Sequence, residues 1–301
     1  MGNVTAKVIV VANMKGGVGK TTTVIALSEY LAAYGVGDGP KKVAVIDLDA
    51  QASASISIAG NSLLRELIET GRTVEAFLED RMVYRLSKPG FADVLRRHAS
   101  SVTARGQPIT LGLIASSPEL RQIEREVIYS MTDRGYGLRD IESQTRRLTE
   151  PQIENLRTRL DYILVDCPPG ISVFSEAMFS IADIVLTPVI PDFISTRGLA
   201  AFCRNVLKAN TQPLKQLPRV LINRYTASKH HRETIDALKR DASSADPQFT
   251  LLSTMVPSRP DIERALEAEA GSTFESRWGS VSADIYRKLA LELVGRPRAR
   301  I

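Results

Sequence analysis

The sequence has few of the residues that build disulfide scaffolds and metal centres, and no apolar run long enough for a membrane span. Its 301 residues include two cysteines, three histidines and one tryptophan. Cys167 and Cys203 stand far apart and form no C-x-x-C pair, which rules out a disulfide scaffold and argues against a cysteine-ligated metal centre. No apolar run approaches the roughly 18 residues of a membrane-spanning helix. We therefore expect a cytoplasmic protein.

The composition that remains is that of an ordinary globular protein. Hydrophobic residues make up 44% and charged residues 24% of the chain, enough to bury a substantial core and too apolar for a disordered one. Lysine and arginine number 39 against 34 acidic residues, a formal charge of +5. This balance permits a nucleic-acid partner without requiring one.

Short apolar runs alternate with helical patterns along most of the chain. Consecutive apolar residues, as in 8–11 and 163–165, are typical of parallel strands covered on both faces. Strands are predicted at 7–13, 42–48, 109–114, 161–166, 183–188, 219–223 and 250–256. Helices are predicted at 21–34, 117–130, 150–159, 172–182, 196–210, 229–242, 259–270 and 282–294. The alternation predicts an α/β fold: a doubly wound, mostly parallel sheet with helices on both faces.

Two stretches depart from this rhythm. Residues 53–105 contain helical fragments and no convincing strand, so we expect a helical excursion with loops near Gly60, Pro89 and Gly106. Residues 132–149 are charged and weakly patterned, and we expect a loop there. Since there is no internal repeat or long linker, residues 1–301 are predicted to form a single domain, ending in a short basic tail at 295–301.

The strongest motif is the run Lys-Gly-Gly-Val-Gly-Lys-Thr-Thr at 15–22, which follows a predicted strand and opens a predicted helix. That is the context of a phosphate-binding loop. Its glycines let backbone N–H groups approach an anion, and the helix N-terminus adds partial positive charge. Lys20 would contact the terminal phosphates of ATP, and the Thr21 hydroxyl would ligate Mg²⁺. The predicted nucleotide-binding residues of the loop are Lys15, Gly16, Gly17, Val18, Gly19, Lys20, Thr21 and Thr22.

The loop also differs from the ordinary phosphate loop. Counting back from Gly19, the first glycine of that motif would fall on Met14, whereas a second lysine, Lys15, precedes the Gly-Gly-Val-Gly-Lys-Thr core. In this the sequence resembles the ParA/MinD superfamily of ATPases, whose signature is K-G-G-x-G-K-[ST]. The resemblance extends over about residues 7–294 and is weakest at 53–105. It implies a homodimer closed around two ATP molecules, with Lys15 reaching the nucleotide of the partner.

Carboxylates end two of the predicted strands, at Asp47-Leu-Asp49 and at Asp166. Acids at the carboxyl ends of parallel strands face the ligand side of a sheet, and such groups hold Mg²⁺ and position water. Either acid of the first pair could instead cap a helix. The runs resemble the D-x-D-P-Q motif, with Ala50 in place of proline, and the D-C-P-P run of the ParA branch. The resemblance implies that Asp166 and Asp47 support the metal. The catalytic residues that it implies are Lys15, Lys20 and Asp49.

Two later strand ends resemble the places where the family contacts adenine. They contribute Asn223 and Pro257, and the resemblance implies that both lie beside the base. From the residues alone, Asn223 is equally well explained as a turn residue.

Positive charge is concentrated in the last third of the chain, where residues 204–240 hold nine basic side chains and two acidic ones. Such a face attracts a phosphate backbone regardless of base sequence, although a solvated basic helix has the same composition. The resemblance favours non-specific DNA binding. The candidate contacts are Arg204, Lys208, Lys229, Arg232, Arg259 and Arg264.

The resemblance implies a ParA-like ATPase that segregates plasmid or chromosome DNA, is stimulated by a ParB-like centromere-binding adaptor, and associates with the nucleoid when ATP is bound. The alternative is a MinD-like ATPase that cycles on a membrane. That function needs an amphipathic C-terminal anchor, and the residues at 295–301, with proline and a single apolar residue at the end, make a poor one. We therefore expect no stable association with membranes.

Overall fold

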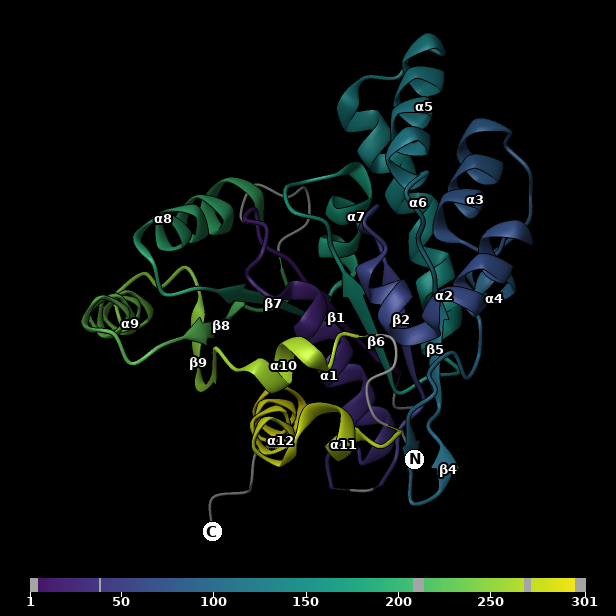
Figure 1. Cartoon of the computed structure of the whole chain (residues 1–301). Coiled ribbons are helices and arrows are strands. Elements are labelled where there is room, and N and C mark those ends of the chain that lie inside the picture. The colour runs from purple at the N-terminus through teal and green to yellow at the C-terminus, as the bar shows by residue number, and fades with distance from the viewer. Residues whose placement is uncertain (1–4, 38, 208–213, 268–271, 296–301) are drawn as a thin grey trace.

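The computed structural model describes residues 5–37, 39–207, 214–267 and 272–295 (Figure 1). At its centre is a seven-stranded sheet in the order β5-β2-β6-β1-β7-β8-β9. The strands are β1 (Lys7–Val11), β2 (Val43–Asp47), β5 (Leu111–Ile114), β6 (Tyr162–Asp166), β7 (Ile184–Val189), β8 (Arg219–Tyr225) and β9 (Thr250–Pro257). Every neighbouring pair is parallel, which confirms the predicted sheet and all seven predicted strands.

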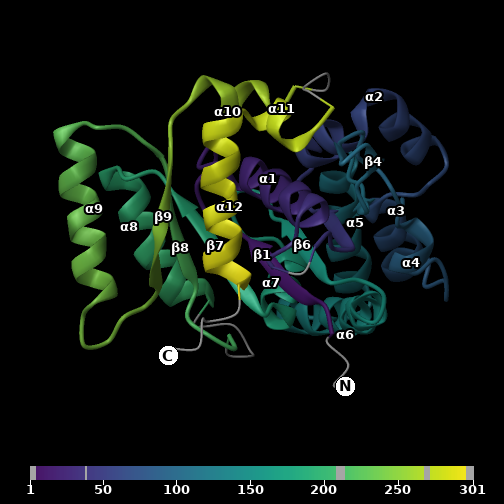
Figure 2. The ribbon, with the colours of Figure 1, turned by 90° about the horizontal axis from the view of Figure 1, so that it is seen from below.

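Helices cover both faces of the sheet, so its central strands are buried along nearly their whole length (Figure 2). Alternate residues of β1 point to opposite sides: Ile9 and Val11 join one core and Val8 and Val10 the other. On the first side lie α1 (Lys20–Ala33), α11 (Phe274–Trp278) and α12 (Ser280–Val294). On the second lie α5 (Leu120–Asp133), α6 (Leu138–Arg157) and α7 (Val173–Ile181), continued over β7 to β9 by α8 (Phe193–Phe202) and α9 (Lys229–Ala242). No helix in the described ranges is long and apolar enough to cross a membrane.

The prediction of a loop at 132–149 is wrong, because most of these residues belong to α6. The helix buries a stripe that includes Ile141, Thr145 and Thr149. The two threonine hydroxyls donate to carbonyl oxygens one turn earlier, at 2.8 and 2.9 Å, so threonine can occupy buried positions of this helix. Pro151 lies inside the helix, where it removes one backbone hydrogen bond without ending it.

Two other helices differ from the prediction in their bounds, and one short helix was not predicted. The helix predicted at 196–210 begins earlier, at Phe193, and ends in the π-helical turn η2 (Cys203–Leu207). The helix predicted at 259–270 is reduced to α10 (Pro260–Arg264), and α11 was not predicted. Residues 208–210 and 268–270 of the predicted helices lie outside the described ranges.

The excursion at 53–105 is helical, as predicted, and consists of α2 (Ser53–Glu69), α3 (Val74–Leu78), the π-helical turn η1 (Glu79–Val83) and α4 (Phe91–Val94). The loop expected at Gly60 is instead a kink within α2, since Gly60 alone leaves the helical conformation, at φ 70°. The turn at Gly106 joins a two-stranded hairpin of β3 (Thr103–Ala104) and β4 (Gln107–Pro108).

The two outer strands of the sheet are capped by other parts of the chain. Beside β5, Arg96 of the excursion exchanges two backbone hydrogen bonds with Leu113, at 2.9 and 2.8 Å. Beside β9, the carboxylate of Glu292 on α12 accepts the backbone N–H groups of Ser253 and Thr254, at 2.5 and 2.8 Å. The N–H and C=O of Leu113 and the N–H groups of Ser253 and Thr254 therefore already have partners within the chain.

Candidate functional site

The glycine-rich loop joins β1 to α1 at the carboxyl edge of the sheet. Gly17 and Gly19 have φ of +73° and +88°, a region that side chains disfavour. A Cβ at Gly19 would lie 2.1 Å from the amide nitrogen of Asn223. That amide donates to the carbonyl oxygen of Val18, at 2.7 Å. The close approach of Asn223 therefore requires glycine at residue 19.

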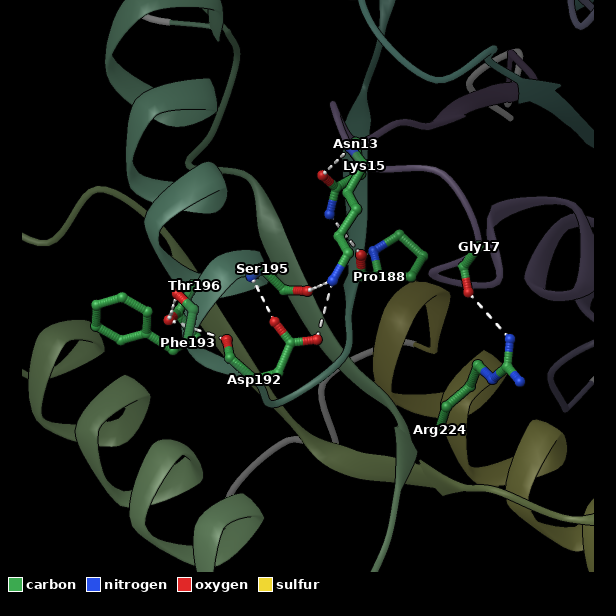
Figure 3. A network of polar contacts seen from close by, with 9 residues as sticks. All are labelled: Asn13, Lys15, Gly17, Pro188, Asp192, Phe193, Ser195, Thr196 and Arg224. Atoms are coloured by element: carbon green, nitrogen blue, oxygen red, sulfur yellow. Dashed lines mark hydrogen bonds and ion pairs between the residues drawn. The ribbon is translucent and has the colours of Figure 1, made fainter.

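The end of β8 also holds the loop through Arg224. Its guanidinium donates to the carbonyl oxygen of Gly17 at 3.2 Å (Figure 3). Among the described residues, no hydrogen bond engages the backbone N–H groups of Gly16, Gly17 or Gly19. The carbonyl oxygens of Gly17 and Val18 thus face β8, while backbone N–H groups of the loop are free to bind an anion. This is the arrangement of a phosphate site.

Lys20 begins α1 and is 6% exposed. Its ammonium donates to the carbonyl oxygen of Lys15, at 3.1 Å. Burial lowers the pKa of Lys20, and the charges of Asp166 and Asp49 act in the opposite direction. The lysine, the loop and both acids therefore converge at one place, as predicted from their positions in the sequence.

Asp166 and Asp47 face each other in register at the ends of β6 and β2, and both are fully buried. Burial raises the pKa of Asp166 well above its usual value, Asp47 adds repulsion, and the Thr21 hydroxyl and Lys20 oppose the shift. Neither carboxylate oxygen of Asp166 has a well-formed hydrogen bond. An unsatisfied buried carboxylate beside a threonine hydroxyl fits a cation that prefers oxygen ligands, as Mg²⁺ does.

The carboxylate of Asp47 is by contrast fully engaged. One oxygen accepts the backbone N–H of Asp49 at 3.0 Å, and the other accepts the N–H and hydroxyl of Ser55 at 2.9 and 2.7 Å. Burial raises the pKa of Asp47 to about 6. In the part of the chain that the structure describes, no three His, Cys, Asp or Glu side chains form a group that could hold a metal ion. A metal here would need phosphate and water oxygens as further ligands.

Lys15 turns toward its own chain rather than away from it (Figure 3). Its ammonium donates to a carboxylate oxygen of Asp192 at 3.0 Å and to the hydroxyl of Ser195 at 2.9 Å. Hydrogen bonds from Ser195 and Lys15 lower the pKa of Asp192 despite its partial burial. The sequence analysis missed both acceptors, although Asp-x-x-Ser ahead of a helix is a capping pattern and Asp192 does cap α8.

A cleft of about 100 Å³ adjoins the loop. Its lining brings Asn223 and Pro257, the two expected adenine neighbours, together with Gly19 and Thr22. Arg259, expected at a DNA surface, lines the same cleft and forms an ion pair with Asp261 at 2.9 Å.

Comparison with known proteins agrees with this geometry. A family model described as an AAA domain matches residues 6–218. The chain belongs to this family, within the ParA/MinD superfamily. The chromosome partitioning protein ParA of Myxococcus xanthus is 26% identical over 221 residues, 73% of this chain, which spans 65% of that relative's length. The chromosome-partitioning ATPase Soj of Thermus thermophilus is 24% identical over 294 residues, 96% of this chain and 95% of Soj.

Solved structures share the fold of this ParA-like chain. An ATP complex of McdA from Cyanothece superposes with a TM-score of 0.68 at 19% identity, covering 97% of this chain and 98% of McdA. The structure of pNOB8 ParA bound to nonspecific DNA superposes with a TM-score of 0.63 at 18% identity, covering 95% of this chain and 98% of that protein. At such identities the likeness shows the fold alone.

The candidate DNA contacts of the ParA-like chain do not form a single patch. Lys229 and Arg232 lie exposed on α9, and Arg204 lies exposed on η2, directly after α8, which packs against α9. Arg264 ends α10, apart from α9 in both views (Figures 1 and 2). Lys208 lies outside the described residues.

Exposed apolar side chains lie at the same edge of the sheet as the glycine-rich loop. Met14, Ile171, Phe193 and Ile194 are exposed by 41%, 43%, 59% and 72%. They belong to the segments that follow β1, β6 and β7, at the carboxyl edge that carries the glycine-rich loop. Apolar groups clustered around one feature mark a surface suited to contact with another protein.

Proposed function

We propose that this protein is an ATP- and Mg²⁺-dependent ATPase that dimerises on ATP and positions DNA with a partner adaptor. One observation supports nucleotide binding above all: a loop with free backbone donors, a buried lysine and an unsatisfied buried carboxylate converge at one edge of the sheet. In this proposal Lys20 neutralises the terminal phosphates, while Thr21 and Asp166 hold the metal. Asn223 and Pro257 contact the base.

Asp47, the last residue of β2, and Asp49, two residues later, have different roles in this proposal. Asp49 orients the attacking water, since it lies near Lys20 and is more accessible than its neighbour. Asp47 supports the metal region as a positioning residue, because its oxygens fix the backbone at Asp49 and the start of α2. Bound Mg²⁺ would supply further neutralisation of phosphate charge.

Dimerisation is supported by the position of Lys15 and by the apolar groups around it. In one chain Lys15 is held by Asp192 and Ser195. In the proposed dimer it leaves these acceptors and contacts the nucleotide of the partner subunit. Phe193 and Ile194, next to Asp192 in the chain, are exposed in the single subunit and become covered.

The proposed DNA binding and ParB-like adaptor are supported by surface charge and by the relatives. Exposed basic side chains on α9 and η2, namely Lys229, Arg232 and Arg204, offer a surface for the phosphate backbone. The DNA complex of the structural neighbour and the partitioning roles in the names of the relatives are consistent with this. We propose that the protein acts in the cytoplasm and joins the nucleoid when it holds ATP.

The test compares three purified variants for ATP turnover and for ATP-dependent dimerisation by sedimentation. Lys20→Ala is expected to lose both, because its charge offsets the phosphates. Asp49→Ala is expected to dimerise on ATP without turning it over. Lys7→Ala removes an exposed lysine at the start of β1 and serves as the matched control. Normal ATP turnover by Lys20→Ala would contradict the proposed role of Lys20 at the terminal phosphates.

A further inference from the structure

A second cleft lies in a part of the molecule that the proposed nucleotide chemistry does not use. It has a volume of about 300 Å³ and is lined by residues of η1, of α5 and α6, and of the turns that follow η1 and α5. Its lining residues are Arg81, Met82, Arg85, Met131, Arg134, Tyr136, Gln144, Arg147 and Leu148. Four of these are arginine and none is acidic, so we call it the arginine cleft.

Two of the arginines hold the cleft together. Arg134 at the end of α5 donates to the carbonyl oxygens of Met82 and Val83, at 3.2 and 2.9 Å. Arg81 donates to the carbonyl oxygens of Ser87 and Pro89, at 2.8 and 3.2 Å. A guanidinium has five N–H donors and keeps its charge in such bonds. Both residues therefore fix the walls and still contribute positive charge.

The other two arginines, Arg85 and Arg147, are exposed. Neither guanidinium has a hydrogen bond or an ion pair with any residue that the structure describes. No ion pair joins any of the four arginines to an acidic side chain within the described ranges, and no acid lines the cleft. The lining of the cleft therefore carries an excess of positive charge, which favours an anionic occupant.

The floor of the cleft indicates the class of anion. Met82 and Met131 are buried there, and Leu148 and Tyr136 are half-buried. Tyr84 and Leu86, which flank Arg85 in the chain, are exposed by 60% and 51%. A nucleic-acid backbone gains nothing from a thioether floor, whereas a peptide can direct carboxylates to the arginines and an apolar side chain to the methionines.

We propose that the arginine cleft is the docking site for an acidic segment of a partner protein, with an apolar side chain placed among its carboxylates. The segment must come from another chain. The parts of this sequence outside the described residues contain two isolated acids, Asp38 and Glu269. Charge complementarity and the apolar floor together select this partner over a purely phosphate ligand.

The test uses the full chain and fluorescence anisotropy of a short labelled peptide of alternating glutamate and leucine. Two matched peptides replace glutamate by glutamine or leucine by serine. The double variant Arg85→Glu/Arg147→Glu is expected to weaken binding of the first peptide by roughly tenfold or more, since two charge-assisted contacts are reversed. Arg65→Glu reverses the charge of another exposed arginine, on α2, and is expected to leave binding unchanged.

Three outcomes would overturn the proposal: equal binding of the glutamine peptide, no effect of the double variant, or a loss of duplex DNA binding in that variant without a loss of peptide binding. ATP turnover is expected to stay normal in every variant and serves as the check on folding. If charge reversal disturbs the fold, Arg85→Gln/Arg147→Gln keeps the side-chain bulk and must still weaken binding of the acidic peptide.

Discussion

The ion pair between Lys15 and Asp192 allows ATP-dependent self-association to be changed without altering the phosphate loop. We predict that Asp192→Asn tightens the ATP-bound dimer. Asparagine caps a helix as well as aspartate does, so the bond from the Ser195 N–H, now 2.7 Å long, can remain. The charge that holds Lys15 at 3.0 Å is lost, and Lys15 becomes easier to release toward the partner.

The expected size of the effect follows from the exposure of the pair. The side chains of Lys15 and Asp192 are 37% and 29% exposed, so solvent screening limits each pair to about 0.3–1 kcal/mol. A symmetric dimer must open two such pairs, which totals about 0.6–2 kcal/mol, or a roughly 3- to 30-fold lower dissociation constant. The difference should shrink as salt is added.

The assay is sedimentation velocity with ATP in the Asp49→Ala background, where turnover is expected to be blocked. Asp236→Asn on α9 is the matched control, because it also removes the charge of a partly exposed aspartate that pairs with a lysine. A double-mutant cycle with Lys15→Ala shows whether the tighter dimer of Asp192→Asn depends on Lys15. An unchanged or weaker dimer would refute the reasoning, as would the same gain from Asp192→Asn when Lys15 is absent.

Three further predictions concern the loop and the core. Gly19→Ala places a methyl group 2.1 Å from Asn223 and should abolish binding of a fluorescent ATP analogue; normal binding would contradict the role of this glycine. Arg277→Met leaves Glu29, its buried partner at 2.9 Å, without a counter-charge, so urea unfolding should show a loss of about 3–5 kcal/mol, and a loss under 1 kcal/mol would contradict this. Hydrogen bonds to Asp183 outweigh its burial and lower its pKa below 3.8, so its stabilisation is complete above that pH and disappears as pH falls through the lower, folded-state value. Asp183→Asn should therefore cost about 1–3 kcal/mol at pH 7 and much less in acid, whereas a gap independent of pH would exclude this carboxylate as the cause.

The strands were predictable because burial on both faces demands consecutive apolar residues, a pattern that Ile163 to Val165 display and that few other elements share. The loop at 15–22 was predictable because phosphate chemistry restricts both residue type and spacing. Its convergence with Asp49 and Asp166 followed, since parallel strands bring their carboxyl ends to one edge.

What could not be predicted depends on contacts between distant parts of the chain. Nothing local to Lys15 indicates that Asp192, 177 residues later, lies within 3.0 Å of it. The helix through Thr145 was missed because threonine counts as polar until its hydroxyl is seen to bond within the helix. The arginine cleft was missed because its four arginines come from three segments, the region of η1, the end of α5 and α6, that only the fold brings together.

The caps on β5 and β9 limit how copies of this protein can join. A sheet with free outer N–H and C=O groups invites strand addition from neighbouring molecules, the route to runaway aggregation. Here Arg96 of the excursion bonds both backbone groups of Leu113 on one side, and Glu292 accepts the N–H groups of Ser253 and Thr254 on the other. At these positions a strand from a neighbouring molecule could not pair without first displacing contacts within the chain. We therefore expect copies of this protein to associate through contacts between folded surfaces rather than by strand addition.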